Sequence, residues 1–213
     1  MSKLITLNNN ADKELLSELL NSELIIFEDI QGSKIFVNWD GEQFTMKAKN
    51  VKSDPINLID VAYQKFYNNC IIFFDRLDDR IRGLMNKNWW FGFEYFPDTT
   101  PANVKYNVLP KNNLILTSIY KKNKFDYSIE ELKEYSNLFE TEHLPVIFKG
   151  SLNEEQKEAI QYFLATSEED LEYVFGEKNF TYFFYKLLNP SSANSFLMDN
   201  DFQDNLEKLV LRI

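Results

Sequence analysis

Apolar and polar residues alternate in the first quarter of the chain in a way that predicts three consecutive strands. Apolar residues fill 24–27, a polar turn follows at 31–33, and apolar residues then alternate with polar ones over 35–39. Asp40-Gly41 is a dipeptide favoured in two-residue hairpin turns, because both central residues of such a turn need a positive φ. Residues 44–49 are the predicted returning strand, so we expect an antiparallel meander.

Helical spacing and capping residues predict helices around this meander. Leucines recur at helical spacing over 11–21, and Asp54-Pro55 combines an N-cap with a proline that opens an apolar pattern ending near Arg82-Gly83. Three further helix starts are predicted at residues that can cap a helix, namely Ser128, Asn153 and Ser167. The predicted helices thus come both before and after the predicted strands along the chain.

Further apolar runs predict strands at 89–97, 114–120, 144–150 and near the end of the chain. The aromatic segment 179–188 is compatible with a nucleic-acid stacking platform, but it lacks interleaved arginine and a core segment is favoured. The mixture of strands and helices predicts an α+β fold with antiparallel sheets flanked by helices.

Composition narrows the classes of function. The 213 residues are 44% hydrophobic, which is enough for one substantial core, so we expect one domain over 1–213 with a helical segment at 1–22. A net charge of -10 argues against a generally basic surface, so any contact with nucleic acid is expected to be local. Cys70 and His143 are the only residues of their types, which excludes a disulfide within the chain, a cysteine-rich zinc site and a metal site with several histidine ligands from this chain.

Cys70 lies beside an apolar run and is predicted to be a small buried residue, whereas His143 is predicted to be a surface or capping residue. No window approaches the roughly 20 apolar residues needed to span a bilayer. We therefore expect no membrane partner and a cytoplasmic location, which is the host cytoplasm if the chain is phage-encoded.

Four short motifs carry a resemblance to a known family. They are Glu28-Asp29-Ile30-Gln31-Gly32-Ser33, Lys47-Ala48-Lys49, Phe91-Gly92-Phe93-Glu94-Tyr95 and Glu207-Lys208-Leu209-Val210-Leu211-Arg212. In this order and spacing the chain resembles the catalytic domain of ATP-dependent RNA and DNA ligases, which are covalent nucleotidyltransferases, and phage-type RNA ligases above all. The resemblance covers residues 23–213.

The resemblance implies an ATP-grasp-like nucleotidyltransferase (ligase adenylylation) domain. It also implies ATP and Mg²⁺ as cofactors, and RNA or DNA ends as partners. Carried over motif by motif, it implies a nucleotide site formed by Glu28, Gln31, Gly32, Lys47, Lys49 and Glu94, with Glu207 as a metal ligand. The family's Lys-x-Lys strand, which contacts the phosphates, has no counterpart before Ile213, so a C-terminally truncated domain is expected.

The departures from the family pattern concern the covalent step. Asp29 stands where the family has its nucleophilic lysine, and Gln31 stands where it has an aspartate. An aspartate is a poor nucleophile that would give a labile acyl phosphate, and its charge would repel the triphosphate of ATP unless a bound Mg²⁺ reversed that effect, with Asp29 as its ligand. Lys34 is the candidate substitute nucleophile on the following strand.

Three functions remain open. The first is a degenerate RNA ligase-like domain, a pseudoenzyme that retains a nucleotide- or polynucleotide-binding cleft. The second is an active ATP-dependent RNA ligase that uses a displaced lysine, and the third is a non-enzymatic phage binding or virion-associated module. A purely structural alternative treats Glu94 as a paired buried carboxylate of an ordinary sheet, and Asp29 to Gly32 as a simple turn.

Overall fold

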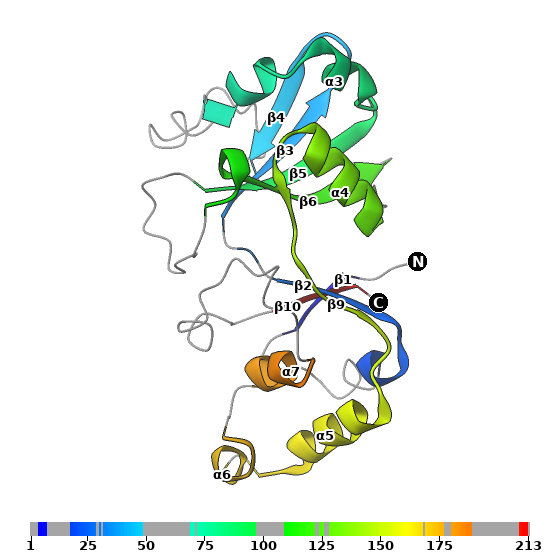
Figure 1. Cartoon of the computed structure of the whole chain (residues 1–213), viewed down its shortest axis with the longest axis vertical. Coiled ribbons are helices and arrows are strands. Elements are labelled where there is room, and N and C mark those ends of the chain that lie inside the picture. The colour runs from blue at the N-terminus through cyan, green and yellow to red at the C-terminus, as the bar shows by residue number, and fades with distance from the viewer. Residues whose placement is uncertain are drawn as a thin grey trace. The chain divides into compact units, whose positions relative to one another are not determined.

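A computed structural model describes most of the chain. The described residues are 4–7, 18–28, 30, 32–48, 69–70, 72–96, 109–121, 124–125, 128–167, 169–176, 180–188 and 209–212. The chain divides into two compact units, which we call the terminal unit (Met1–Asp29, Asn103–Asn107 and Pro145–Ile213) and the central unit (Ile30–Ala102 and Val108–Leu144). Strands and helices occur in both (Figure 1), so the predicted α+β class is confirmed. That the units together form one domain stays a prediction.

The central unit is built on one six-stranded sheet (Figure 1). Its path runs β4-β3-β5-β6-β7 with antiparallel pairing throughout, and β8 pairs with β6 in parallel. The strands are β3 (Ser33–Trp39), β4 (Phe44–Ala48), β5 (Trp89–Tyr95), β6 (Leu114–Lys121), β7 (Lys124–Phe125) and β8 (Glu142–His143). The predicted strands over 35–39, 44–49, 89–97 and 114–120 are thus confirmed, and the chain enters β6 through a short 3-10 turn, η1 (Lys111–Asn113). The first strand predicted for the meander, at 24–27, pairs within the sheet of the terminal unit instead, so the predicted three-stranded meander is wrong.

The hairpin between β3 and β4 differs from the prediction. Trp39 pairs with Phe44, which leaves residues 40–43 in the loop, so the predicted two-residue turn is wrong. The Asp40 carboxylate accepts hydrogen bonds from the backbone N–H groups of Gln43 at 2.8 Å and Glu42 at 2.7 Å, and these bonds lower the pKa of Asp40. An aspartate side chain that satisfies two loop donors favours this longer loop, in which Gly41 has a φ of 109°.

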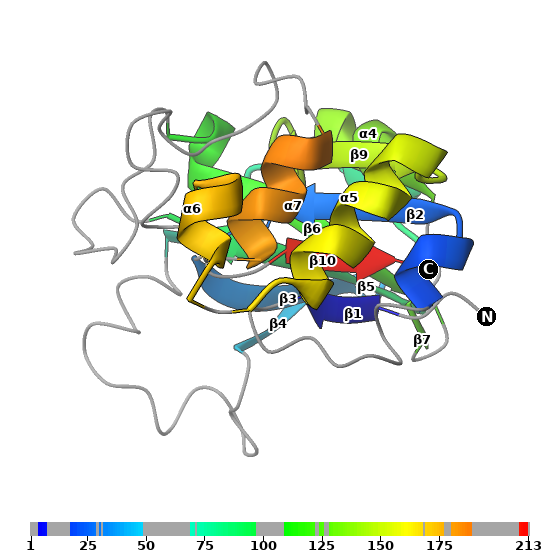
Figure 2. The ribbon, with the colours of Figure 1, turned by 90° about the horizontal axis from the view of Figure 1, so that it is seen from below.

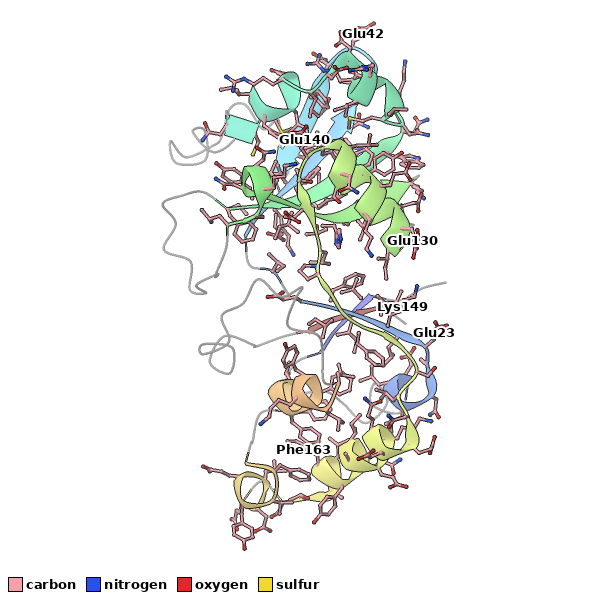
Figure 3. The ribbon with its side chains drawn as sticks, in the orientation of Figure 1. Glu23, Glu42, Glu130, Glu140, Lys149 and Phe163 are labelled. Atoms are coloured by element: carbon pink, nitrogen blue, oxygen red, sulfur yellow. The ribbon has the colours of Figure 1, made fainter. Side chains whose placement is uncertain are left out.

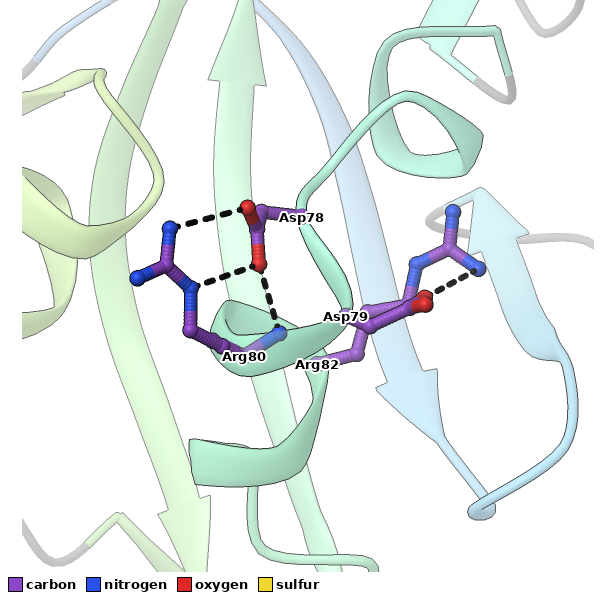
Figure 4. A network of polar contacts seen from close by, with 4 residues as sticks. All are labelled: Asp78, Asp79, Arg80 and Arg82. Atoms are coloured by element: carbon purple, nitrogen blue, oxygen red, sulfur yellow. Dashed lines mark hydrogen bonds and ion pairs between the residues drawn. The ribbon is translucent and has the colours of Figure 1, made fainter.

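The predicted long helix ending near Arg82-Gly83 is interrupted. Its predicted start at Asp54-Pro55 lies outside the described residues, residues 72–75 are helical, and the backbone then leaves the helix before α3 (Asp79–Leu84) begins. Asp78 causes the new start, because its carboxylate caps α3 by accepting from the backbone N–H of Arg80 at 2.8 Å. Its side-chain contacts with the same arginine (Figure 4) are the main cause of the lowered pKa of Asp78.

An aromatic core fills one face of the central sheet. Helix α4 (Ile129–Leu138) begins at the predicted Ser128 capping box, and Phe139, directly after it, is fully buried. The ring of Phe139 lies 5.2 Å from that of Phe91, 5.6 Å from that of Phe93 and 6.2 Å from that of Phe74.

The sole cysteine and the sole histidine also belong to the central unit. Cys70 is 1% exposed, as predicted, and burial raises the pKa of its thiol to about 12. His143 is half-buried rather than on the surface, with its ring Nδ1 3.0 Å from the carbonyl oxygen of Leu144.

The terminal unit holds a four-stranded antiparallel sheet in the order β1-β10-β2-β9. Its strands are β1 (Leu4–Leu7), β2 (Leu24–Glu28), β9 (Val146–Gly150) and β10 (Leu209–Arg212). Strand β1 lies in the segment predicted to be helical, so that prediction is wrong for these four residues. Their strand conformation depends on pairing with β10, from the other end of the chain. Residues 18–21 are helical as predicted, and 11–17 lie outside the described residues.

Three helices pack on this sheet (Figure 2), and their buried side chains form one core with those of β2. They are α5 (Glu154–Ala165), α6 (Leu171–Phe175) and α7 (Phe180–Leu188). Helix α5 begins at the predicted Asn153 capping box, whereas α6 begins four residues after Ser167, whose hydroxyl donates to Asp170 at 2.6 Å. Phe163 of α5, labelled in Figure 3, stacks on Phe183 of α7 at 4.3 Å.

The aromatic segment that becomes α7 belongs to this core. Phe180 is 5% exposed and Phe184 is fully buried, which confirms the core interpretation over a stacking platform. Among the described residues, no helix is both long enough and apolar enough to cross a membrane.

Candidate functional site

Three residues from the resemblance meet in the central unit. Glu94 of β5 pairs directly across the sheet with Lys34 of β3, and its Oε1 lies 3.2 Å from the Lys34 Nζ. The backbone N–H of Gly32 donates to the other carboxylate oxygen, Oε2, at 3.1 Å. The side chain of Glu94 is 2% exposed and that of Lys34 is 42% exposed. We call these three residues the Glu94 cluster.

The alternation of β5 explains why a carboxylate is buried here. Phe91 and Phe93 point into the aromatic core, so Trp90, Gly92 and Glu94 lie on the opposite face of the strand. A carboxylate removed from water needs hydrogen-bond donors or a counter-charge. The Glu94 cluster supplies both, through a backbone N–H group and an ammonium group that is itself still in contact with water.

Gly32 is required by a close approach of two backbones. A Cβ at this position would lie 3.0 Å from the carbonyl oxygen of Tyr95 and 3.1 Å from both the Cβ and Oε2 atoms of Glu94. A side chain at this position would require these neighbours to give by a few tenths of an ångström. The glycine of the resembling motif therefore has a defined structural role in the Glu94 cluster.

Removing the ammonium group of Lys34 should destabilise the central unit. Lys34→Met keeps the length of the side chain but leaves the buried Glu94 carboxylate without this counter-charge. Breaking a fully buried pair costs about 3–5 kcal/mol, but solvent screens the exposed Lys34, so we expect about 1–2 kcal/mol. Urea unfolding followed by tryptophan fluorescence measures this change.

The double variant Lys34→Met/Glu94→Gln should recover part of the loss, because no uncompensated charge is then buried. Lys111→Met, at an exposed lysine of the same unit, is the matched control and should change the unfolding free energy by less than about 0.5 kcal/mol. Equal losses in Lys34→Met and Lys111→Met would show that the ion pair contributes nothing.

A second group of side chains lies further along the same face. Lys47 of β4 pairs across from Phe36 of β3, and its Nζ lies 4.4 Å from the centre of the Trp90 ring. Tyr120 of β6 pairs across from Trp90, and its ring lies 5.4 Å from that of Phe36. We call Phe36, Lys47, Trp90 and Tyr120 the Trp90 cluster.

Sequence reasoning found only Lys47 of this cluster. The available signal was the alternation of β5, which places Trp90 on the face of Glu94, but the pairing with Phe36 and Tyr120 depends on strand register. Gly92 lies between the two clusters, and a Cβ there would lie 2.3 Å from the Ser118 hydroxyl and 3.0 Å from the Phe36 ring. Glycine thus lets Phe36 lie directly against β5.

The other predicted site residues do not meet within the described part of the chain. Asp29, Gln31, Lys49 and Glu207 lie outside them. Glu28 is fully buried at the end of β2 in the terminal unit, where its backbone N–H donates to the Pro145 carbonyl at 3.3 Å. Within the described part of the chain, no group of three or more His, Cys, Asp or Glu side chains is placed to hold a metal ion.

The side chains of the two clusters offer a hydrogen-bond acceptor and positive charges to a ligand. A carboxylate oxygen can accept more than one hydrogen bond, so a carboxylate such as that of Glu94 is chemically able to accept from a ligand hydroxyl. Lys34 and Lys47 offer positive charge to an anion.

No protein-family model matches the chain, and no curated protein is detectably similar to it in sequence.

Proposed function

We propose that this chain is an RNA ligase-like nucleotidyltransferase domain, with an ATP-grasp-like fold, that binds a nucleotide without forming a covalent adenylate. One observation carries the proposal. Gly32 and Glu94 belong to two separate motifs of the resemblance, 62 residues apart in the sequence, and they are joined by a hydrogen bond. The resemblance predicts that both motifs contribute to one nucleotide site, and their contact supports that prediction.

The residues of the central unit fit parts of a nucleoside triphosphate. In this proposal Glu94 accepts from a ribose hydroxyl while Lys34 stays paired with it, since a carboxylate oxygen can accept more than one hydrogen bond. Lys34 and Lys47 are the cations on this face for the phosphates. A divalent cation fits less well, because the described residues offer no cluster of acidic ligands, and the function proposed here needs no metal-dependent step.

The absence of a covalent step follows from the two candidate nucleophiles. Asp29 lacks the amine on which the family's chemistry depends, and an acyl phosphate formed there would be labile. Lys34, the candidate substitute, is ion-paired with Glu94. Binding without covalent transfer is therefore the function that these side chains support best.

Incubation with α-labelled ATP and Mg²⁺, followed by denaturing electrophoresis, tests this function. We expect no label on the denatured chain, whereas equilibrium dialysis of the native chain should detect bound ATP. Glu94→Gln should weaken that binding about tenfold, since a hydrogen bond to a charged group contributes roughly 1.5–3 kcal/mol and the amide keeps part of it.

Two other outcomes would overturn the proposal. A covalent adduct on Lys34, Lys47 or Lys49 would show an active ligase with a displaced lysine. A folded chain that binds no ATP would favour the non-enzymatic binding module.

A further inference from the structure

We propose that the Trp90 cluster is a stacking site for one nucleobase of a single-stranded nucleic acid, with Lys47 facing the neighbouring phosphate. The proposal rests on the proposed function, from which it takes the class of ligand, and it adds a site separate from the Glu94 cluster. Trp90 and Glu94 are four residues apart on β5, which is about 13 Å along a strand. A ribose at Glu94 and a base at Trp90 therefore cannot belong to one nucleoside.

The cluster combines the two features that single-strand binding needs. Phe36, Trp90 and Tyr120 are each partly buried, so part of each residue is still in contact with water. Lys47 is exposed, and among the described residues no carboxylate pairs with it. Aromatic faces beside cations bind single strands because every base has a face that stacks and every nucleotide carries a phosphate.

The neighbouring Trp89 makes a similar contact with a lysine, but there the partners belong to helix α4 of the central unit. Trp89 points to the opposite face of β5 and also lies under a lysine, with the Lys121 Nζ 4.6 Å from its ring. That lysine is held by Glu131 of α4 at 2.5 Å, and Tyr135 of the same helix lies 5.9 Å from the Trp89 ring. Helix α4 thus supplies partners for both members of this second pair.

The relative strengths of the contacts allow a base to replace Lys47 over Trp90. A cation–π contact at an exposed site shifts an equilibrium by about two- to fivefold, whereas stacking of one base shifts it by about five- to 150-fold. Displacing the lysine is therefore favourable overall. The released ammonium remains beside the ring, where the phosphate of a stacked nucleotide would lie.

Charge favours a nucleic acid as the occupant. The chain as a whole carries a net charge of -10 and Lys34 on this face is paired with Glu94, but the exposed Lys47 beside Trp90 has no carboxylate partner among the described residues. A polyanion approaching an acidic protein is attracted where a cation is not neutralised by a nearby carboxylate. The rings distinguish a nucleic acid from other polyanions, because a polyanion without bases gains nothing from them.

Fluorescence anisotropy with a labelled short oligouridylate at low ionic strength tests the proposal. Trp90→Leu should weaken binding by about five- to 150-fold, while Trp89→Leu, the matched control on the opposite face, should change it by less than about twofold. An abasic strand of the same length should bind wild-type protein as weakly as oligouridylate binds Trp90→Leu. Free UMP, the mononucleotide arm, should bind more weakly than the strand, because it lacks neighbouring phosphates.

Lys47→Gln keeps the test decisive even where a tryptophan variant fails to fold, because Lys47 is exposed. It should lower the slope of log affinity against log salt by about 0.7, the value for one phosphate contact to a single strand, and Lys121→Gln should leave the slope unchanged. Absence of oligouridylate binding, equal losses in the two tryptophan variants, or equal binding of the abasic strand would overturn the proposal.

The test of the Trp90 stacking site and the test of ATP binding at Glu94 can give different results. ATP binding that depends on Glu94 should persist in Trp90→Leu, so either site can fail while the other is retained.

Discussion

Replacing Asp29 with asparagine should raise the affinity of the chain for ATP, by up to about a thousandfold. The resemblance places this carboxylate where the family has a lysine next to the α-phosphate. At about 4 Å and an effective dielectric constant near 20, two like charges repel by about 4 kcal/mol, which corresponds to roughly three powers of ten in affinity. Asparagine removes the charge and keeps the size of the side chain. Equilibrium dialysis with ATP in the absence of Mg²⁺ measures the effect.

Adenosine is the control ligand for this prediction, because it lacks phosphates and its affinity should not change. Asp40→Asn, in the exposed loop between β3 and β4, is the control variant and should leave ATP binding as in the wild type. Weaker binding of ATP by Asp29→Asn in the presence of Mg²⁺ would instead identify Asp29 as a metal ligand. No change with either form of ATP would remove Asp29 from the nucleotide site.

Phe139→Ala should destabilise the central unit by about 3–5 kcal/mol. The Phe139 ring is fully buried and contacts three phenylalanines, one on the segment before α3 and two on β5, so its loss leaves a cavity at the centre of the aromatic core. Urea unfolding followed by tryptophan fluorescence measures the loss directly. The chain has three tryptophans, at positions 39, 89 and 90, and all belong to the central unit.

Leu84→Ala is the control for this variant. Leu84 is 59% exposed in α3 of the same unit, so its truncation should change the unfolding free energy by less than about 0.5 kcal/mol. A similar shift of the urea midpoint in both variants would contradict the central position of Phe139 in the core.

The two proposals assign different roles to the two ends of one strand. At one end of β5, Glu94 is buried and bonded to Gly32 and Lys34, while at the other end Trp90 is partly buried beside an exposed lysine. Both ends lie on the face opposite the aromatic core. One face of the strand therefore stabilises the central unit, and the other carries the residues proposed to bind nucleotides.

Local sequence was enough to predict most of the strands and several helix ends. Alternation in β3 and the apolar run of β5 follow directly from residue type, because side chains on a strand alternate between its faces. The capping boxes at Ser128 and Asn153 are equally local, since each cap bonds to the backbone of a residue three positions later. The family motifs also singled out Gly32 and Glu94, which contact each other.

Long-range pairing set the features that the sequence pattern missed. Strand β1 has only four residues and is ordered by its pairing with β10, over two hundred positions away, so no local signal identified it. The break before α3 and the loop after β3 depend on single aspartate side chains that compete with the regular backbone hydrogen bonds of a longer helix and a tighter turn.

The sequence therefore pointed to some of the residues proposed to bind nucleotides, through local pattern and motif. It could not specify which of them meet, because that depends on strand register, and a shift of one residue moves every side chain to the other face. Register places Lys34 opposite Glu94, and it places Lys47, Phe36 and Tyr120 around Trp90. These pairings are long-range contacts between strands, and they appear only once the sheet is assembled.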